Sequence, residues 1–141
     1  AVPYICMHMR GTPQTMQKMT RYEDLIREVL DYFIQRKATC LQRGIRDLMI
    51  DPGFGFAKKS EQNFLLLKQL SVFKMLELPV LVGLSRKSSI YKTLGITAEA
   101  ALNGTTAMNT LALHNGASVL RVHDVKEAVE AIRLWTNYVD S

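Results

Sequence analysis

Four short apolar runs, each followed by polar loop residues and then by a helical pattern, constrain the fold of this 141-residue chain more than any other feature. We expect strands at residues 2–7, 48–50, 80–82 and 118–122. Strands that alternate with helices are joined by right-handed βαβ crossovers and form a parallel sheet. The pattern therefore predicts an α/β fold with four parallel strands, because no period-two alternation indicates an antiparallel sheet.

The first two helices are predicted from their capping residues. Thr20 and Glu23 have the spacing of a capping box, and Gly44 is placed to end the helix that this box would start. Ser60 predicts the start of a second helix that runs to about residue 76. The side chains expected on the inward face of this second helix are Phe64, Leu67 and Leu70.

Three further helices follow the third and fourth strands. A short helix is expected at 90–94, and Thr97 is expected to cap the next one, at 98–115. Asp124 and Glu127 have the spacing of another capping box, which predicts the start of the final helix. Together with the strands, these segments give a strand–helix order repeated four times with one extra short helix.

Composition indicates one folded domain and limits its partners. Hydrophobic residues make up 48% of the chain and charged residues 22%, so we treat residues 1–141 as a single domain with its own core. The net charge is +5, but Lys and Arg are spread along the chain without interleaved aromatic residues. Small anionic ligands explain the excess positive charge as well as nucleic acid does, and we expect no nucleic-acid partner. We also expect no membrane partner, because no apolar stretch is as long as a membrane span and no signal peptide is recognisable.

The two cysteines and the first residues indicate the setting of the chain. Cys6 and Cys40 lack the spacing of a metal site, so we expect free thiols in a reducing compartment, by default the cytoplasm. The chain starts with Ala1 and enters an apolar run at once, as if in the middle of a fold. We therefore expect a piece of a longer or processed protein.

Polar residues of different chemistry follow the four expected strands. Because the carboxyl ends of parallel strands meet at one edge of the sheet, we expect these residues to lie together where α/β folds bind ligands. In chain order they are Met7 and His8, Asp51 with its glycine–phenylalanine loop, Gly83 with Ser85–Ser88, and Arg121 with His123.

The segment Pro79–Ser88, PVLVGLSRKS, shows why a ligand is one of two interpretations. Gly83 lets another backbone or a flat ligand approach closely, and the hydroxyl and cationic groups that follow suit an anion at a helix start. An ordinary polar loop between a strand and a helix explains the same residues equally well.

The residues after the second strand also have two interpretations. Asp51 can accept two parallel N–H bonds from the edge of a heterocycle, or it can cap its own turn before Pro52 and Gly53, which is the simpler role. Phe54 and Phe56 lie on a loop too short to bury both rings. One ring can stack on a ligand or pack against the neighbouring helix.

Arg121 and His123 lie two residues apart, so they point the same way if the strand continues through them. A guanidinium beside an imidazole suits a phosphate or diphosphate group. Ion pairs with Asp124 or Glu127 are the alternative. His8 and His114 carry no comparable signal, and no HExxH, Walker A or GxGxxG motif is found.

Taken together, these motifs resemble those of the bacterial dihydropteroate synthases. The matching segments are MHMRGTPQTMQ (7–17), DPGFGFAK (51–58), LVGLSRKS (81–88), NGTTA (103–107) and RVHDV (121–125). The resemblance implies a (β/α)8 TIM barrel, of which this chain would be the C-terminal half. It also implies the joining of p-aminobenzoate to a dihydropterin methyl diphosphate with release of pyrophosphate, a step of folate synthesis that sulfonamides target.

The resemblance assigns a pterin site to four of these residues. It implies that Met7 packs on the pterin and that Asp51 accepts from its amino and ring N–H groups. Gly83 would line the same pocket, and Lys87 would reach the polar edge of the pterin.

The resemblance assigns the second substrate and the leaving group to other positions. Phe56 and Ser88 would hold p-aminobenzoate, and Arg121 and His123 would form part of the diphosphate site. Catalytic roles are implied for Lys87, Arg121 and His123. No metal ligand is implied within this chain.

A full barrel needs eight strands, and this sequence predicts four. The resemblance therefore implies that the Mg²⁺ ligand belongs to an N-terminal half absent from these residues, and that the isolated chain is inactive. It also implies a homodimer. Two alternatives stay open, the pterin domain of a methyltransferase and a non-catalytic pterin-binding module.

Overall fold

A computed structural model describes residues 2–141. In chain order the elements are β1 (Tyr4–Met7), the 3-10 helix η1 (Met16–Lys18), α1 (Leu25–Gln42), β2 (Leu48–Asp51), α2 (Ser60–Lys68), the 3-10 helix η2 (Leu70–Leu76), β3 (Leu81–Val82), α3 (Ser88–Leu94), α4 (Leu102–His114), β4 (Val119–Leu120) and α5 (Val125–Asp140). No helix within this range is long and apolar enough to cross a membrane.

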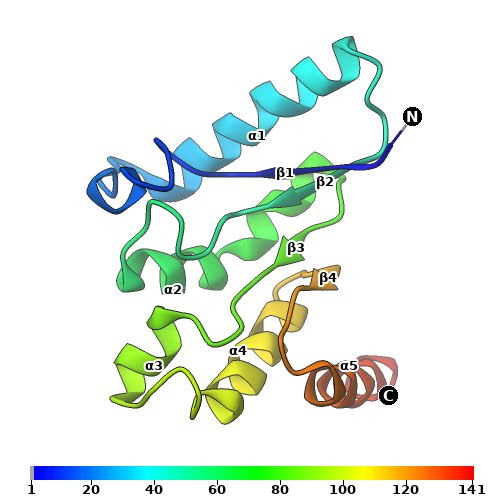
Figure 1. Ribbon diagram of the computed structural model, residues 1–141. Coiled ribbons are helices and arrows are strands. Elements are labelled where there is room, and N and C mark those ends of the chain that lie inside the picture. Colours follow the sequence, from blue (N-terminus) through cyan, green and yellow to red (C-terminus); the bar gives the residue numbers. More distant parts are fainter. Residues whose placement is uncertain (1) are drawn as a thin grey trace.

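The four strands are parallel and lie in their chain order (Figure 1). β1 pairs with β2, which places Met7 opposite Asp51, and β3 pairs with β4. A parallel bridge between Ile50 and Val80 joins the two pairs. The predicted alternation of parallel strands and helices is confirmed, and the carboxyl ends of the strands meet at one edge.

Helices cover one face of the strands and leave the other open. Leu48 and Ile50 of β2 belong to the buried core with residues of α1, α2 and η2. Because side chains alternate along a strand, Met49 and Asp51 lie on the opposite face. Asp51 thus ends its strand on the face that the helices do not cover.

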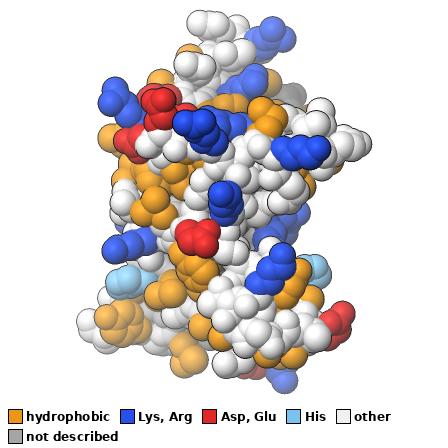
Figure 2. Space-filling view, turned by 90° about the vertical axis from the view of Figure 1, so that its left-hand side faces the viewer, with side chains coloured by type: hydrophobic (Ala, Val, Ile, Leu, Met, Phe, Trp, Pro, Cys, Tyr) orange, Lys and Arg blue, Asp and Glu red, His pale blue; other side chains and the backbone are white. Residues whose placement is uncertain are grey.

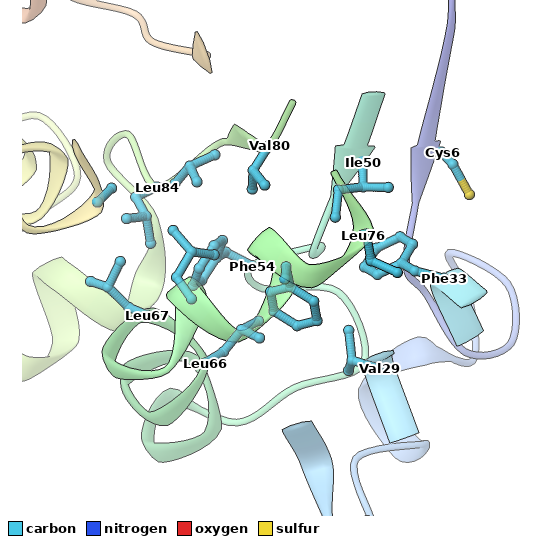
Figure 3. Packing of buried hydrophobic residues seen from close by; sticks show 14 of the residues in the cluster. Cys6, Val29, Phe33, Ile50, Phe54, Leu66, Leu67, Leu76, Val80 and Leu84 are labelled. Carbon is cyan, nitrogen blue, oxygen red and sulfur yellow. The ribbon is translucent and has the colours of Figure 1, made fainter. Parts of the chain in front are cut away.

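The core lies between the strands and the helices that cover them (Figure 3). Phe33 of α1 and Phe73 of η2 are almost fully buried and meet edge to face, with ring centroids 5.8 Å apart. Phe54, from the loop after β2, packs into the same cluster. Cys6 and Cys40 are free and buried, as the sequence predicts for their thiol state.

The predicted start of α1 at Thr20 is wrong. The helix begins at Leu25, and its cap is Asp24, whose carboxylate accepts from the backbone N–H of Arg27. Tertiary contacts explain the difference, because the Gln62 side chain donates to the Thr20 carbonyl and the Arg10 guanidinium donates to that of Arg21. These carbonyls are held outside the helix by partners distant in sequence.

Two later helix starts also differ from the prediction. α2 begins at Ser60 with Lys59 as its cap, and residues 70–76 form a separate 3-10 helix. α4 begins at Leu102, not after Thr97, because the Arg86 guanidinium takes the carbonyls of residues 98 and 99. Of the residues expected inside α2 and η2, Leu67 and Leu70 are buried, whereas Phe64 is exposed and Leu66 takes its place in the core.

Candidate functional site

The carboxyl ends of the strands form a rim with two parts. We call the loops after β1 and β2 (residues 8–13 and 52–58) the β1–β2 rim, and the loops after β3 and β4 (residues 83–87 and 121–124) the β3–β4 rim. The strands run toward the left of Figure 1, so Figure 2 looks onto this edge and shows Lys and Arg side chains distributed over it.

Asp51 is buried at the end of β2, and its carboxylate forms the turn that the simpler interpretation predicts. Its Oδ1 accepts from the backbone N–H of Gly53 at 2.8 Å. Each carboxylate oxygen has two lone pairs, so this turn leaves acceptor capacity for a ligand. The turn and a ligand-binding role are therefore compatible at this position.

The two phenylalanines of the following loop have different surroundings, as the sequence predicts. Phe54 is buried in the core, whereas Phe56 is partly exposed at the rim. The Lys87 ammonium lies 5.0 Å from the centre of the Phe56 ring and donates to the Phe54 carbonyl. Phe56 is thus the aromatic face that a ligand at this rim can reach.

Lys87 links the two parts of the rim. Burial, followed by the charge of Arg121, lowers the pKa of its ammonium to about 8, against the opposing charge of Asp51. The pKa of Lys87 therefore depends on the Asp51 carboxylate and on the Arg121 guanidinium. The predicted gathering of Asp51, Lys87 and Arg121 at one edge agrees with this electrostatic coupling.

A pocket of about 210 Å³ occupies the β3–β4 rim, and it is lined by Gly83, Ser85, Lys87, Arg121, Val122 and His123. Arg121 and His123 are exposed on it, although β4 ends at Leu120 and the strand does not extend through them. A Cβ at Gly83 would lie 3.0 Å from Nη2 of Arg121. The glycine therefore provides the space that the guanidinium occupies.

Ser85 orients His123, a role that sequence reasoning did not assign. The Ser85 hydroxyl lies 2.8 Å from Nδ1 of His123 and accepts from the backbone N–H of the same residue at 3.2 Å. Ser85 itself is buried. This double contact fixes the imidazole at the pocket wall, with its other nitrogen free of this contact.

Arg86 takes the carboxylate that was expected to cap α5. Its Nε and Nη2 donate to the two carboxylate oxygens of Asp124 at 2.9 and 3.0 Å. This charge pair holds the pKa of Asp124 below its ordinary range. α5 starts directly after Asp124 as predicted, but the Asp124 side chain forms no cap, so the predicted capping box is wrong. The ion pairs found among residues 2–141 are Arg10–Glu28 and Arg86–Asp124, and they do not include Arg121.

The backbone of Arg86 is as constrained as its side chain. Its φ of 53° lies in the left-handed region, and its N–H donates to the Thr105 hydroxyl at 3.0 Å. Thr105 belongs to the NGTTA segment of α4. Arg86 thereby ties the loop after β3 to α4 and to the loop after β4.

Ser88 and Met7 lie at the margins of the site. Ser88 starts α3 and lines a separate pocket of about 350 Å³ together with Gly55 and Lys58. Asn63 of α2 joins the loop after β2 to α3 there, because it accepts from the Gly55 N–H at 2.9 Å and donates to the Ser89 hydroxyl at 2.9 Å. Met7 ends β1 on the same face as Asp51.

His8 and Lys58 form a buried pair that the sequence did not indicate. The Lys58 ammonium lies 2.9 Å from Nδ1 of His8. Burial, followed by the nearby charges of Lys58 and Arg10, lowers the pKa of His8 to about 3. Burial likewise lowers the pKa of Lys58 to about 7, against the opposing charge of Asp51. A lone histidine and a lysine fifty positions later give no pairing signal in a single sequence.

The described residues do not fit a divalent metal. Within 2–141 no three His, Cys, Asp or Glu side chains are grouped as metal ligands. Hard cations such as Mg²⁺ need several oxygen ligands, whereas the pocket of the β3–β4 rim is lined by cationic side chains. This rim is therefore suited to bind an anion directly.

Comparison with known proteins identifies relatives of this arrangement. Residues 1–123 match the family model described as pterin binding enzyme. The dihydropteroate synthase of Escherichia coli strain K12 is 46% identical over 135 residues, which are 94% of this chain and 48% of that protein. The corresponding enzyme of Haemophilus influenzae is 39% identical over 96% of this chain and 50% of its own length.

Solved structures show the same relationship. A Yersinia pestis dihydropteroate synthase in a sulfonamide drug complex superposes with a TM-score of 0.96 at 38% identity, covering 99% of this chain and 52% of that one. A Thermus thermophilus dihydropteroate synthase in complex with 4-aminobenzoate gives a TM-score of 0.91 at 37% identity, covering 94% and 54%. The fold is part of a TIM barrel, as predicted, and the chain spans about half the length of these relatives.

Proposed function

The chain belongs to the family of pterin-binding enzymes, and from that membership we propose that it is the C-terminal half of a dihydropteroate synthase. Residues 1–141 form one pterin-binding domain in this proposal. The observation that carries it is the convergence of a buried carboxylate, Asp51, with the cationic pocket of Lys87 and Arg121 at one rim.

The proposed substrates fit the two parts of the rim. Asp51 and Met7 on the open face of the strands suit a flat heterocycle with N–H donors, with Gly83 and Lys87 at its edge. Phe56, beside Lys87, and Ser88, which lines the second pocket, would hold p-aminobenzoate. Arg121 and His123 would bind the diphosphate, which carries the negative charge.

The proposed reaction is a substitution at the methylene carbon of the pterin. The carbon–oxygen bond to the diphosphate breaks, the amine nitrogen of p-aminobenzoate bonds to that carbon, and one amine proton is lost. Lys87, Arg121 and His123 would stabilise the charge of the departing pyrophosphate. The rim requires no protein nucleophile for this chemistry.

The finer assignments about Mg²⁺ and assembly are also proposals. Mg²⁺ would be held by residues outside this chain, since the described rim does not fit it. A groove of about 430 Å³ between α4 and α5 is lined by Leu111, Leu134 and Tyr138, all exposed, which supports a homodimer through these helices. Two free cysteines support a reducing compartment, the cytoplasm.

A chimera tests the proposed function. This chain would replace the matching half of the Escherichia coli enzyme, and pyrophosphate release would be measured with both substrates and Mg²⁺. We expect turnover by the chimera, negligible turnover by the 141 residues alone, and a loss of about 100-fold in kcat/KM for Asp51→Asn, since a charged acceptor is lost.

The control is an exposed acid, Glu130→Gln on α5, which should retain full activity. A folded chimera that binds pterin but not p-aminobenzoate would favour the pterin domain of a methyltransferase. A folded chimera that binds no pterin would overturn the assignment altogether.

A further inference from the structure

Lys58 makes an unusual set of contacts for a lysine on a loop. Only 4% of the residue is exposed, and its ammonium reaches three acceptors: Nδ1 of His8 at 2.9 Å, the Gly53 carbonyl at 3.0 Å and the Phe56 carbonyl at 3.0 Å. All three ammonium hydrogens are thereby used. An ammonium is costly to bury unless it is fully hydrogen-bonded, and this one is.

The acceptors belong to two segments that are far apart in sequence. His8 follows β1, whereas Gly53 and Phe56 belong to the loop after β2. The backbones also touch directly, since a Cβ at Gly53 would lie 2.0 Å from the carbonyl oxygen of His8. The His8 imidazole in turn packs edge to face against the Tyr32 ring, with ring centroids 4.9 Å apart. Lys58 therefore joins the loop to a part of the rim that is itself fixed.

The bonds of Lys58 act on the part of the loop that carries the Phe56 ring. The Gly53 carbonyl accepts from Lys58 and also from the Phe56 N–H at 3.0 Å. Both backbone polar groups of Phe56 are therefore fixed, its carbonyl by Lys58 and its N–H by Gly53. Asp51 is held by the pairing of β1 with β2 and by the Gly53 N–H, whereas Lys58 bonds to the Gly53 carbonyl.

We propose that Lys58 is a positioning residue for the amine substrate: by holding the carbonyls of Gly53 and Phe56 against His8, it fixes the Phe56 ring beside Lys87. This inference rests on the proposed function, because it identifies Phe56 with the p-aminobenzoate site. It places the pterin at the end of β2, where Asp51 lies, and the amine at the loop that Lys58 holds. Loss of Lys58 should therefore impair binding of the amine and spare that of the pterin.

The test compares Lys58→Met with Lys58→Arg in the chimera described above. We expect Lys58→Met to raise the KM for p-aminobenzoate about 10-fold, since charged hydrogen bonds that order the loop are lost, and to change the KM for the pterin diphosphate less than about 2-fold. Lys58→Arg keeps the charge and the donors and should recover part of the loss. Lys68→Met, at an exposed position of α2, is the matched control.

A second measurement does not depend on activity. Amide hydrogen exchange at Gly55 and Phe56, in the 141-residue chain, should accelerate in Lys58→Met about 10-fold and stay unchanged in Lys68→Met. Equal losses for both substrates, or exchange and KM values equal to those of the Lys68→Met control, would overturn the proposal. If the unmutated chimera uses neither substrate, the proposed function and the amine role fail together, and the exchange data alone decide whether Lys58 orders the loop.

Discussion

The two parts of the rim differ in how their polar groups are satisfied. In the β1–β2 rim, His8 and Lys58 are buried and bonded to protein atoms, as is Asp51 at the adjoining end of β2. In the β3–β4 rim, Arg121 and His123 are exposed on a pocket. A buried, internally bonded surface keeps its shape without a ligand and suits a flat, uncharged ring, whereas open cations suit an anion that arrives with its own charge. Under the proposed function, we therefore expect hydrogen bonds from a preformed surface on one side and attraction between opposite charges on the other.

Lowering the pH should destabilise the fold through the buried β1–β2 rim, and we expect this to be the largest of the effects predicted here. His8 has a folded-state pKa of about 3 against an ordinary value of 6.5, so the unfolded chain binds a proton that the folded chain does not. The free energy of unfolding should therefore fall as the pH is lowered from 6.5 toward 3, by about 4 kcal/mol in total. Urea denaturation at a series of pH values measures this fall.

Two histidine variants sharpen the acid experiment. His8→Gln keeps an acceptor for Lys58 but cannot titrate, so its stability should depend less on pH over the same range. His114→Gln, at an exposed position, controls for the loss of a histidine. If His8→Gln and the unmutated chain lose stability in parallel, His8 is not the group responsible.

Removal of Arg121 should weaken anion binding at the β3–β4 rim and leave the β1–β2 rim unchanged. Arg121→Ala deletes an exposed guanidinium, and this guanidinium forms no ion pair among residues 2–141. Affinity for the pterin diphosphate should fall about 30-fold, because charged hydrogen bonds to the anion are lost. Affinity for the hydroxymethyl pterin without diphosphate should be unchanged.

Calorimetric titration of both ligands measures this contrast, with the exposed Arg133→Ala on α5 as the control. The affinity for the diphosphate should also weaken as salt is added, since exposed charges are screened. Equal losses for the two pterins would mean that the two parts of the rim are not separable in this way.

A smaller effect is expected from Arg86, which supports the open side without lining its pocket. Arg86→Lys loses the bidentate contact with Asp124 and the contacts with the carbonyls of Ala98 and Glu99. The loops that carry Lys87 and His123 should loosen, and affinity for the diphosphate should fall about 5-fold. The measurement is the same titration, and Arg133→Lys is the control; an unchanged affinity would show that these loops are held by other contacts.

The sequence predicted the strands well because their signal is local. Apolar runs at 48–50 and 80–82 are short, bounded by loop residues, and buried in the structure much as expected. Helix starts were predicted less well, since Thr20 and Thr97 have good local signals that distant partners override. A capping signal describes what a residue can do, and the tertiary hydrogen bonds decide whether it does so.

The site shows the same division between local and distant information. The residues gathered at the strand ends were predictable because parallel strands bring their carboxyl ends together. The partners of these residues were not, as Ser85 with His123 and Arg86 with Asp124 show. Each of these pairs spans 38 positions, and no periodic pattern connects residues so far apart.

Gly53 limits which residues the loop after β2 can carry at this position. Any side chain there would meet the His8 backbone at 2.0 Å, and the φ of 75° already disfavours other residues. A substitution would have to push β1 away from β2 and so disturb the carboxylate that ends β2. The approach of the loop after β2 to the end of β1 therefore depends on one position that only glycine can fill.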